Sequence, residues 1–237
     1  MSKRRNLQRL VLAIAAFTVI GLAAVAASAD SITLNTAPGA TTGGGPVSAS
    51  VTFNVSAAGT LQITLTNSTA NPTDVAQNIS DLSFQAGTLS GSLTTSAASF
   101  INVAGNGTTS GAGSGLTGWA LDSSTGGNFH LTVLGTAIGP AHTILGVPGP
   151  GGVYTNANGS IAGNGPHNPF INQTATFTLS ISGLTSVSQL SNVSISFGTT
   201  TGVNVPVTSV PEPTTMLLLG TGLLGVAGVA RRRFRKR

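Results

Sequence analysis

Residues 47–66, VSASVTFNVSAAGTLQITLT, carry the clearest structural signal in the chain. Apolar side chains alternate with Ser, Thr and Asn over residues 47–55, and the alternation resumes over residues 61–65. A period of two is typical of a strand that buries one face. Ala57-Ala58-Gly59 lies between the two runs and predicts a turn. The stretch is therefore expected to form an antiparallel hairpin whose apolar face needs a second layer to cover it.

Similar short runs recur along the chain and predict further strands. They are separated by stretches rich in Gly, Ser, Thr and Asn, a composition that favours strands and turns over helices. Residues 105–118 are expected to be a flexible loop, and residues 135–168 a long irregular section. We therefore predict an all-β domain over residues 30–209, an antiparallel β-sandwich for which a jelly roll is one arrangement. The further runs lie at residues 81–86, 99–103, 119–122, 128–134, 174–181, 193–197 and 203–207.

Residues 1–29 have the three parts of a secretory signal peptide. Basic residues are clustered in residues 1–9, an apolar run follows over residues 10–25, and Ala27 and Ala29 form an A-x-A site. This order predicts a helical signal segment with cleavage between Ala29 and Asp30. The general secretory machinery is the expected partner.

Residues 210–237 combine a short motif, an apolar segment and a basic terminus. Pro211-Glu212-Pro213 comes first, and residues 214–230 carry no charge. A helix of that length would span about 25 Å, near the lower limit for crossing a bilayer. The basic end should stay in the cytoplasm, which predicts a transmembrane helix with the preceding domain on the outer side. The residues of this cytoplasmic stop are Arg231, Arg232, Arg233, Arg235, Lys236 and Arg237.

This arrangement resembles the PEP-CTERM sorting signal of Gram-negative bacteria. The resemblance covers residues 210–237 and implies that exosortase, a membrane-embedded protease, recognises Pro211-Glu212-Pro213 and removes the tail. It further implies a precursor anchored in the inner membrane with its domain in the periplasm. The processed product would then reach the cell surface or the extracellular matrix.

The charged residues exclude nucleic acid as a partner. All ten Lys and Arg residues lie in residues 1–9 or 231–237, so the formal net charge of +5 belongs to the two ends. Residues 30–209 have only four charged residues, Asp30, Asp74, Asp81 and Asp122, so this region cannot neutralise phosphates. The chain has no cysteine, so an exported product must be held together by its core alone.

Few side chains between the two ends could carry chemistry. Asp74, Asp81 and Asp122 could in principle supply the paired carboxylates of a hydrolase, although Asp is also common at turns for backbone reasons. His130, His142 and His167 match no local metal-ligand spacing and are interpreted as solvated or bonded to backbone. No metal or cofactor is predicted, and calcium bound by Asp and carbonyl oxygens stays open.

These observations predict an exported, non-enzymatic surface or matrix protein that is processed at both ends and associates with exopolysaccharide. One alternative is a carbohydrate-binding module, for which Trp119 and Tyr154 are the candidate sugar platform if their rings are exposed. The other is a secreted hydrolase, which requires two of the three Asp side chains in one cleft.

Overall fold

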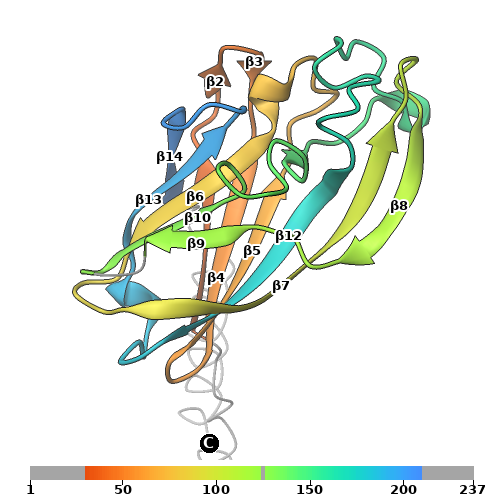
Figure 1. The fold of residues 1–237 in the computed structure, drawn as a ribbon. Coiled ribbons are helices and arrows are strands. Elements are labelled where there is room, and N and C mark those ends of the chain that lie inside the picture. The colour runs from red at the N-terminus through yellow and green to blue at the C-terminus, as the bar shows by residue number, and fades with distance from the viewer. Residues whose placement is uncertain (1–29, 124–125, 210–237) are drawn as a thin grey trace, which may run out of the picture.

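The computed structural model describes residues 30–123 and 126–209, and the regular secondary structure of this part of the chain is almost entirely strand (Figure 1). Three single 3-10 turns interrupt them: η1 (Val75–Gln77), η2 (Pro150–Gly152) and η3 (Val187–Gln189). The all-β prediction is confirmed. The strands are β1 (Asp30–Thr36), β2 (Thr41–Thr42), β3 (Gly45–Pro46), β4 (Ala49–Ala57), β5 (Thr60–Asn67), β6 (Ile79–Gln85), β7 (Gly91–Val103), β8 (Thr109–Gly115), β9 (Ala120–Ser123), β10 (Asn128–Thr132), β11 (Ile144–Leu145), β12 (Phe170–Ile181), β13 (Ser191–Phe197) and β14 (Asn204–Ser209).

The predicted hairpin is confirmed as β4 and β5. The two strands pair antiparallel with Phe53 opposite Ile63. Gly59 has a φ of 80°, a left-handed conformation that favours glycine, at the turn between them. Apart from Ala57 at the end of β4, the apolar residues of both strands are buried. The intervening Ser, Thr, Asn and Gln side chains lie on the other face, as the period of two requires.

The sandwich prediction is wrong, because the strands close into an eight-stranded barrel. The hydrogen-bonded order runs β12-β5-β4-β1-β14-β13-β6, and β11 joins β6 back to β12. Ile144 in β11 lies opposite Ile79 of β6 and Ile171 of β12. We call this junction of β6, β11 and β12 the seam. In a sandwich of two separate sheets, β6 and β12 would have free edges here, and the two residues of β11 cover them.

Four strands extend the sheet beyond the closed ring. β7 and β8 continue outward from β12, and β10 and β9 continue outward from β6 (Figure 1). β8 corrects the prediction of a flexible loop over residues 105–118. It is an edge strand with all seven residues exposed, paired to β7 with Ser99 Oγ 3.1 Å from Ser114 Oγ. A strand with no buried face has no apolar alternation to reveal it.

Aromatic rings fill the interior. The ring of Phe84 packs edge-on against Phe53 with centroids 5.3 Å apart, and it stacks on Phe129 at 4.9 Å. A smaller cluster, which includes Leu145, Tyr154 and Phe170, lies beneath the long connection between β10 and β12. The irregular section predicted from the sequence therefore has a core of its own.

The first and last described strands are neighbours in the sheet. β1 and β14 pair antiparallel, with Leu34 opposite Ser209, so β14 runs toward the end of the barrel where Asp30 lies. β3 leads into the start of β4 at the opposite end, since Asp30 pairs with Val55 near the end of β4. Residues 30–123 and 126–209 contain no helix long and apolar enough to span a membrane. The predicted signal helix and transmembrane helix lie outside the described residues.

Candidate functional site

In the described part of the chain, one histidine lies between two carboxylates. Asp81 lies on β6, His130 on the adjacent β10 and Asp122 on β9. His130 Nδ1 is 2.8 and 2.9 Å from the two carboxylate oxygens of Asp122, and His130 Nε2 is 3.5 Å from Asp81 Oδ1. Both ring nitrogens of the imidazole therefore face a carboxylate.

The two carboxylates lie in different surroundings. The Asp81 side chain is only 2% exposed, whereas that of Asp122 is 49% exposed. Burial raises the pKa of Asp81, and the neighbouring Ser196 hydroxyl and the charge of His130 counter this only in part. The exposed pair of His130 and Asp122 contributes little to stability, because solvent screens it.

The sequence prediction for His130 was wrong, since its ring is bound by side chains. The register explains the cluster: His130 pairs with Ser83 of β6, and Asp81 is two residues further along the same face. Diagonal neighbours of this kind lie within reach of each other across an antiparallel pair. Pairing residues 79–85 with residues 128–132 would have predicted the contact from the sequence.

The other two histidines are bonded to backbone, as predicted. His142 Nδ1 is 2.8 Å from the carbonyl oxygen of Thr117, and His167 Nδ1 is 2.6 Å from that of Ser160. The His142 ring also stacks on Phe100 with centroids 4.3 Å apart. Across residues 30–123 and 126–209, no three His, Asp, Glu or Cys side chains converge in a way that could hold a metal ion.

Asp74 is separate from this cluster and has a structural role. Its carboxylate caps η1 by accepting a hydrogen bond from the amide of Ala76 at 2.8 Å. The second carboxylate oxygen accepts a hydrogen bond of 2.6 Å from the side-chain amide of Asn158. Of the three acidic residues considered for a hydrolase, only Asp81 and Asp122 come together, and an imidazole fills the space between them.

Trp119 and Tyr154 do not form an exposed sugar platform, and that prediction is corrected. Trp119 is 4% exposed and Tyr154 is 1% exposed. The indole Nε1–H donates to the carbonyl of His142 at 2.9 Å, and the Tyr154 hydroxyl donates to the carbonyl of Gly146 at 2.8 Å. Each ring therefore has its polar atom bonded inside the molecule, as buried Trp and Tyr require. Burial also raises the pKa of Tyr154.

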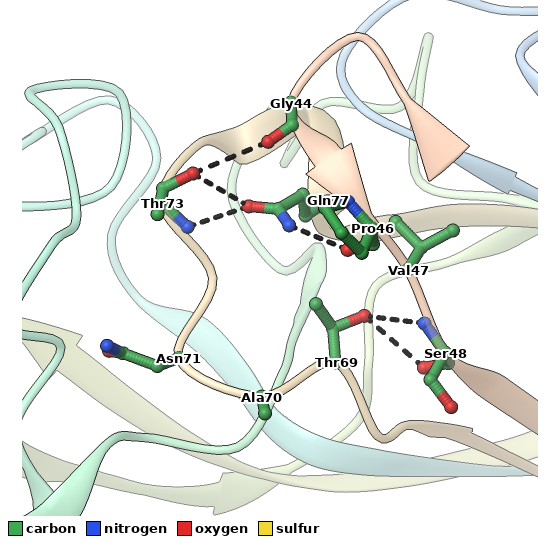
Figure 2. A pocket seen from close by; sticks show the side chains of 9 residues that line it. All are labelled: Gly44, Pro46, Val47, Ser48, Thr69, Ala70, Asn71, Thr73 and Gln77. Atoms are coloured by element: carbon green, nitrogen blue, oxygen red, sulfur yellow. Dashed lines mark hydrogen bonds between the residues drawn. The ribbon is translucent and has the colours of Figure 1, made fainter. Parts of the chain in front are cut away.

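A pocket of about 290 Å³ opens at the barrel end that carries β3, between residues 44–48 and 69–77 (Figure 2). The side chain of Gln77 links the two segments that line the pocket. Its oxygen accepts a hydrogen bond of 2.7 Å from the Thr73 amide, and its amide donates one of 2.7 Å to the Pro46 carbonyl. Thr69 Oγ1 accepts from the amide of Ser48 at 3.0 Å. These contacts hold two loops together and occupy the polar groups that could otherwise meet a ligand.

The outer surface of β1, β4, β5 and β12 forms a regular array of uncharged polar side chains, which we call the hydroxyl–amide face. The register aligns these side chains in three rows of four across the strands. Neighbouring strands in a sheet are about 4.8 Å apart, and alternate residues along a strand are about 6.7 Å apart. The rows are Thr33, Thr52, Thr64 and Thr176; Asn35, Ser50, Thr66 and Thr174; and Ser31, Asn54, Gln62 and Thr178.

The remaining predicted site residues belong to the processing signals. Asp30 begins β1, and its carboxylate accepts a hydrogen bond of 2.7 Å from the amide of Val187. Ala27, Ala29, the Pro211-Glu212-Pro213 motif and the basic terminus lie outside the described residues.

Comparison with known proteins identifies the C-terminal segment. The PEP-CTERM protein-sorting motif matches residues 209–233, a range that contains Pro211, Glu212 and Pro213. No curated protein and no solved structure matches the chain. The motif marks the chain for export and for processing by exosortase, and it thus identifies the chain as a PEP-CTERM protein.

Proposed function

We propose that the chain is a non-enzymatic surface or extracellular-matrix protein, processed at both ends and associated with exopolysaccharide. The observation that carries this proposal is the sorting motif at residues 209–233, which directly follows a domain without a single Lys or Arg. The precursor is anchored in the inner membrane with its domain in the periplasm. Signal-peptide cleavage before Asp30 and exosortase cleavage near Pro211-Glu212-Pro213 then release the domain.

The sheet geometry supports processing at both ends. β1 and β14 are neighbours, and β14 runs toward the end of the barrel where β1 begins. The two chain ends that carry the predicted cleavage points therefore leave the barrel at the same end. A domain held at this end keeps its opposite end, with β3 and the pocket, directed away from the anchor.

The arrangement of Asp81, His130 and Asp122 favours a structural role over hydrolysis. A hydrolase with paired carboxylates needs a space between them for the bond that is cleaved. Here the imidazole of His130 takes that space, and Asp81 is buried. The hydrolase alternative predicts polysaccharide-degrading activity that is lost on Asp122→Asn, whereas the proposed function predicts no such activity in either form.

The delivery part of the proposal can be tested by disabling the motif. The double variant Pro211→Ala/Pro213→Ala removes two residues whose fixed φ angles favour an extended backbone. We expect the precursor to accumulate in the inner membrane at its unprocessed size, while the unaltered chain and a Pro206→Ala control reach the cell surface. Immunoblotting of membrane, surface and medium fractions distinguishes these outcomes. Surface delivery of the double variant at mature size would overturn the proposal.

A further inference from the structure

We propose that the hydroxyl–amide face is a binding surface for an uncharged, extended polysaccharide that lies across β1, β4, β5 and β12. This inference rests on the proposed function. It adds where on the domain the polysaccharide binds and that the polysaccharide is uncharged. It starts from the central row of the face, in which Thr33, Thr52, Thr64 and Thr176 are aligned by three successive strand pairings.

The side chains of the central row are accessible to a ligand. The apolar residues of the same strands, such as Phe53, Ile63 and Phe177, are buried on the other side of the sheet. Thr33, Thr64 and Thr176 are exposed, and Thr52 is partly exposed. The central row is thus a strip of four hydroxyls on the solvent side of the barrel.

The hydroxyls retain hydrogen-bonding capacity after their mutual contacts are counted. Thr33 Oγ1 and Thr52 Oγ1 are 2.9 Å apart, and Thr66 Oγ1 and Thr174 Oγ1 are 3.2 Å apart. A hydroxyl donates once and accepts twice, so each such pair keeps one free donor and several free lone pairs. A polymer rich in hydroxyls offers the matching donors and acceptors.

The absence of charge selects the class of polymer. A soluble protein surface normally has about a quarter to a third of its residues charged. None of the twelve residues of this face is charged, and no Lys or Arg occurs between residues 30 and 209. Asp30 at the start of β1 alternates with Ser31 and so falls on the other face of the strand. An acidic polymer would find no cation here, whereas a neutral polymer needs none.

The same composition argues against a second copy of the chain as the occupant. The centre of a protein–protein interface is enriched in aromatic side chains and depleted of polar ones such as Ser. Every Phe, Trp and Tyr in residues 30–123 and 126–209 is buried, and the face itself consists of Ser, Thr, Asn and Gln.

Without an aromatic platform, the binding depends on many weak contacts. One hydrogen bond that replaces a bond to water contributes little to the free energy of binding. Repeating contacts along one chain add through effective concentration, so a polymer binds where a short oligosaccharide does not. The array, which repeats about every 4.8 Å across strands, supplies such repetition.

The test measures retention of the full-length chain, in a polyoxyethylene non-ionic detergent, on three solids: cellulose, curdlan and calcium alginate beads. We expect retention on at least one of the two neutral glucans and none on anionic alginate. The triple variant Thr52→Val/Thr64→Val/Thr176→Val keeps the β-branched shape and removes three hydroxyls. It should bind the glucan at least about tenfold more weakly, equivalent to about 1.4 kcal/mol.

A matched control removes three hydroxyls elsewhere. Thr41, Thr109 and Thr200 are exposed and lie outside the face, so Thr41→Val/Thr109→Val/Thr200→Val should bind as the unaltered chain does. The single variant Thr64→Lys places a charge in the centre of the face. It should weaken glucan binding and introduce binding to alginate, and it serves if the triple variant fails to fold.

Three results would overturn the inference: retention on alginate alone, equal loss in both triple variants, or a dimer in light scattering that the Thr52/Thr64/Thr176 variant dissociates. The assay does not require processing. Failure to bind glucan by a chain that is correctly delivered therefore refutes this inference alone, and failed delivery of a chain that binds glucan refutes only the proposed function.

Discussion

At the scale of single residues, the burial of two aromatic side chains could not be predicted from the sequence. Trp119 and Tyr154 stood in stretches without strong periodicity, which gave no indication of the face on which either ring would lie. Their burial depends on partners far along the chain: the ring of Trp119 packs at a tilt against Phe177, with ring centroids 5.3 Å apart. Tertiary packing of this kind leaves no local pattern in the sequence. The burial of the two rings therefore could not be predicted from the residues around them.

Asp81 should make the stability of the domain depend on pH. Because burial raises its pKa above the unfolded value, the folded state binds the proton more tightly. The free energy of unfolding therefore falls as pH rises from about 4, near the unfolded pKa, through the folded pKa. Asp81→Asn removes this contribution. Urea unfolding between pH 4 and 7 should show a smaller decline for Asp81→Asn than for the unaltered chain.

The exposed partner of His130 provides the control for that measurement. Asp122→Asn changes a side chain that is 49% exposed and should preserve the decline with pH. An unchanged pH dependence in Asp81→Asn would show that the buried carboxyl is not its source.

Gly107 is held by close backbone contact and should not tolerate a side chain. Its φ is 79°, and a Cβ at this position would lie 2.3 Å from the carbonyl oxygen of Tyr154. Gly107→Ala should lower the free energy of unfolding by more than about 1 kcal/mol. Gly105→Ala is the matched control, because a Cβ there meets no atom within 4 Å. Equal unfolding midpoints for the two variants would contradict this reading of the turn.

At the scale of elements, the strands with one buried face could be predicted and the others could not. β4, β5 and β12 alternate because their apolar residues face the core. β8 has no buried face, and β11 has only two residues, so neither produces a period of two. The missing β11 is also the reason why the prediction gave a sandwich in place of a closed barrel.

The seam at β11 should contribute strongly to stability. Ile144 is fully buried where β6, β11 and β12 meet. Ile144→Ala should lower the free energy of unfolding by about 2–5 kcal/mol, the usual range for a large-to-small change in a core. Leu116→Ala removes a similar volume from a side chain that is 71% exposed, and it should change stability by less than about 0.5 kcal/mol. Similar unfolding midpoints for both variants would mean that the seam is not a stabilising closure.

At the scale of the whole molecule, the export and sorting signals lie at the two ends of the chain, and the folded domain lies between them. The ends hold every Lys and Arg, and the described domain presents uncharged hydroxyls and amides over one broad face. The sorting signal could be recognised from the sequence, because its motif, apolar segment and basic terminus follow one another within a short stretch. The Asp81–His130–Asp122 cluster and the aligned rows of the hydroxyl–amide face required the strand register, which no single segment specifies.

The most direct test of the central claim is the intact mass of the protein recovered from the cell surface and medium. Trypsin cannot cut between residues 30 and 209, because no Lys or Arg occurs there, so the undigested product must be measured. Processing at both ends predicts a product that begins at Asp30 and ends near Pro211 to Pro213. A surface product that retains Arg237 would contradict it and would leave the tail as a plain membrane anchor.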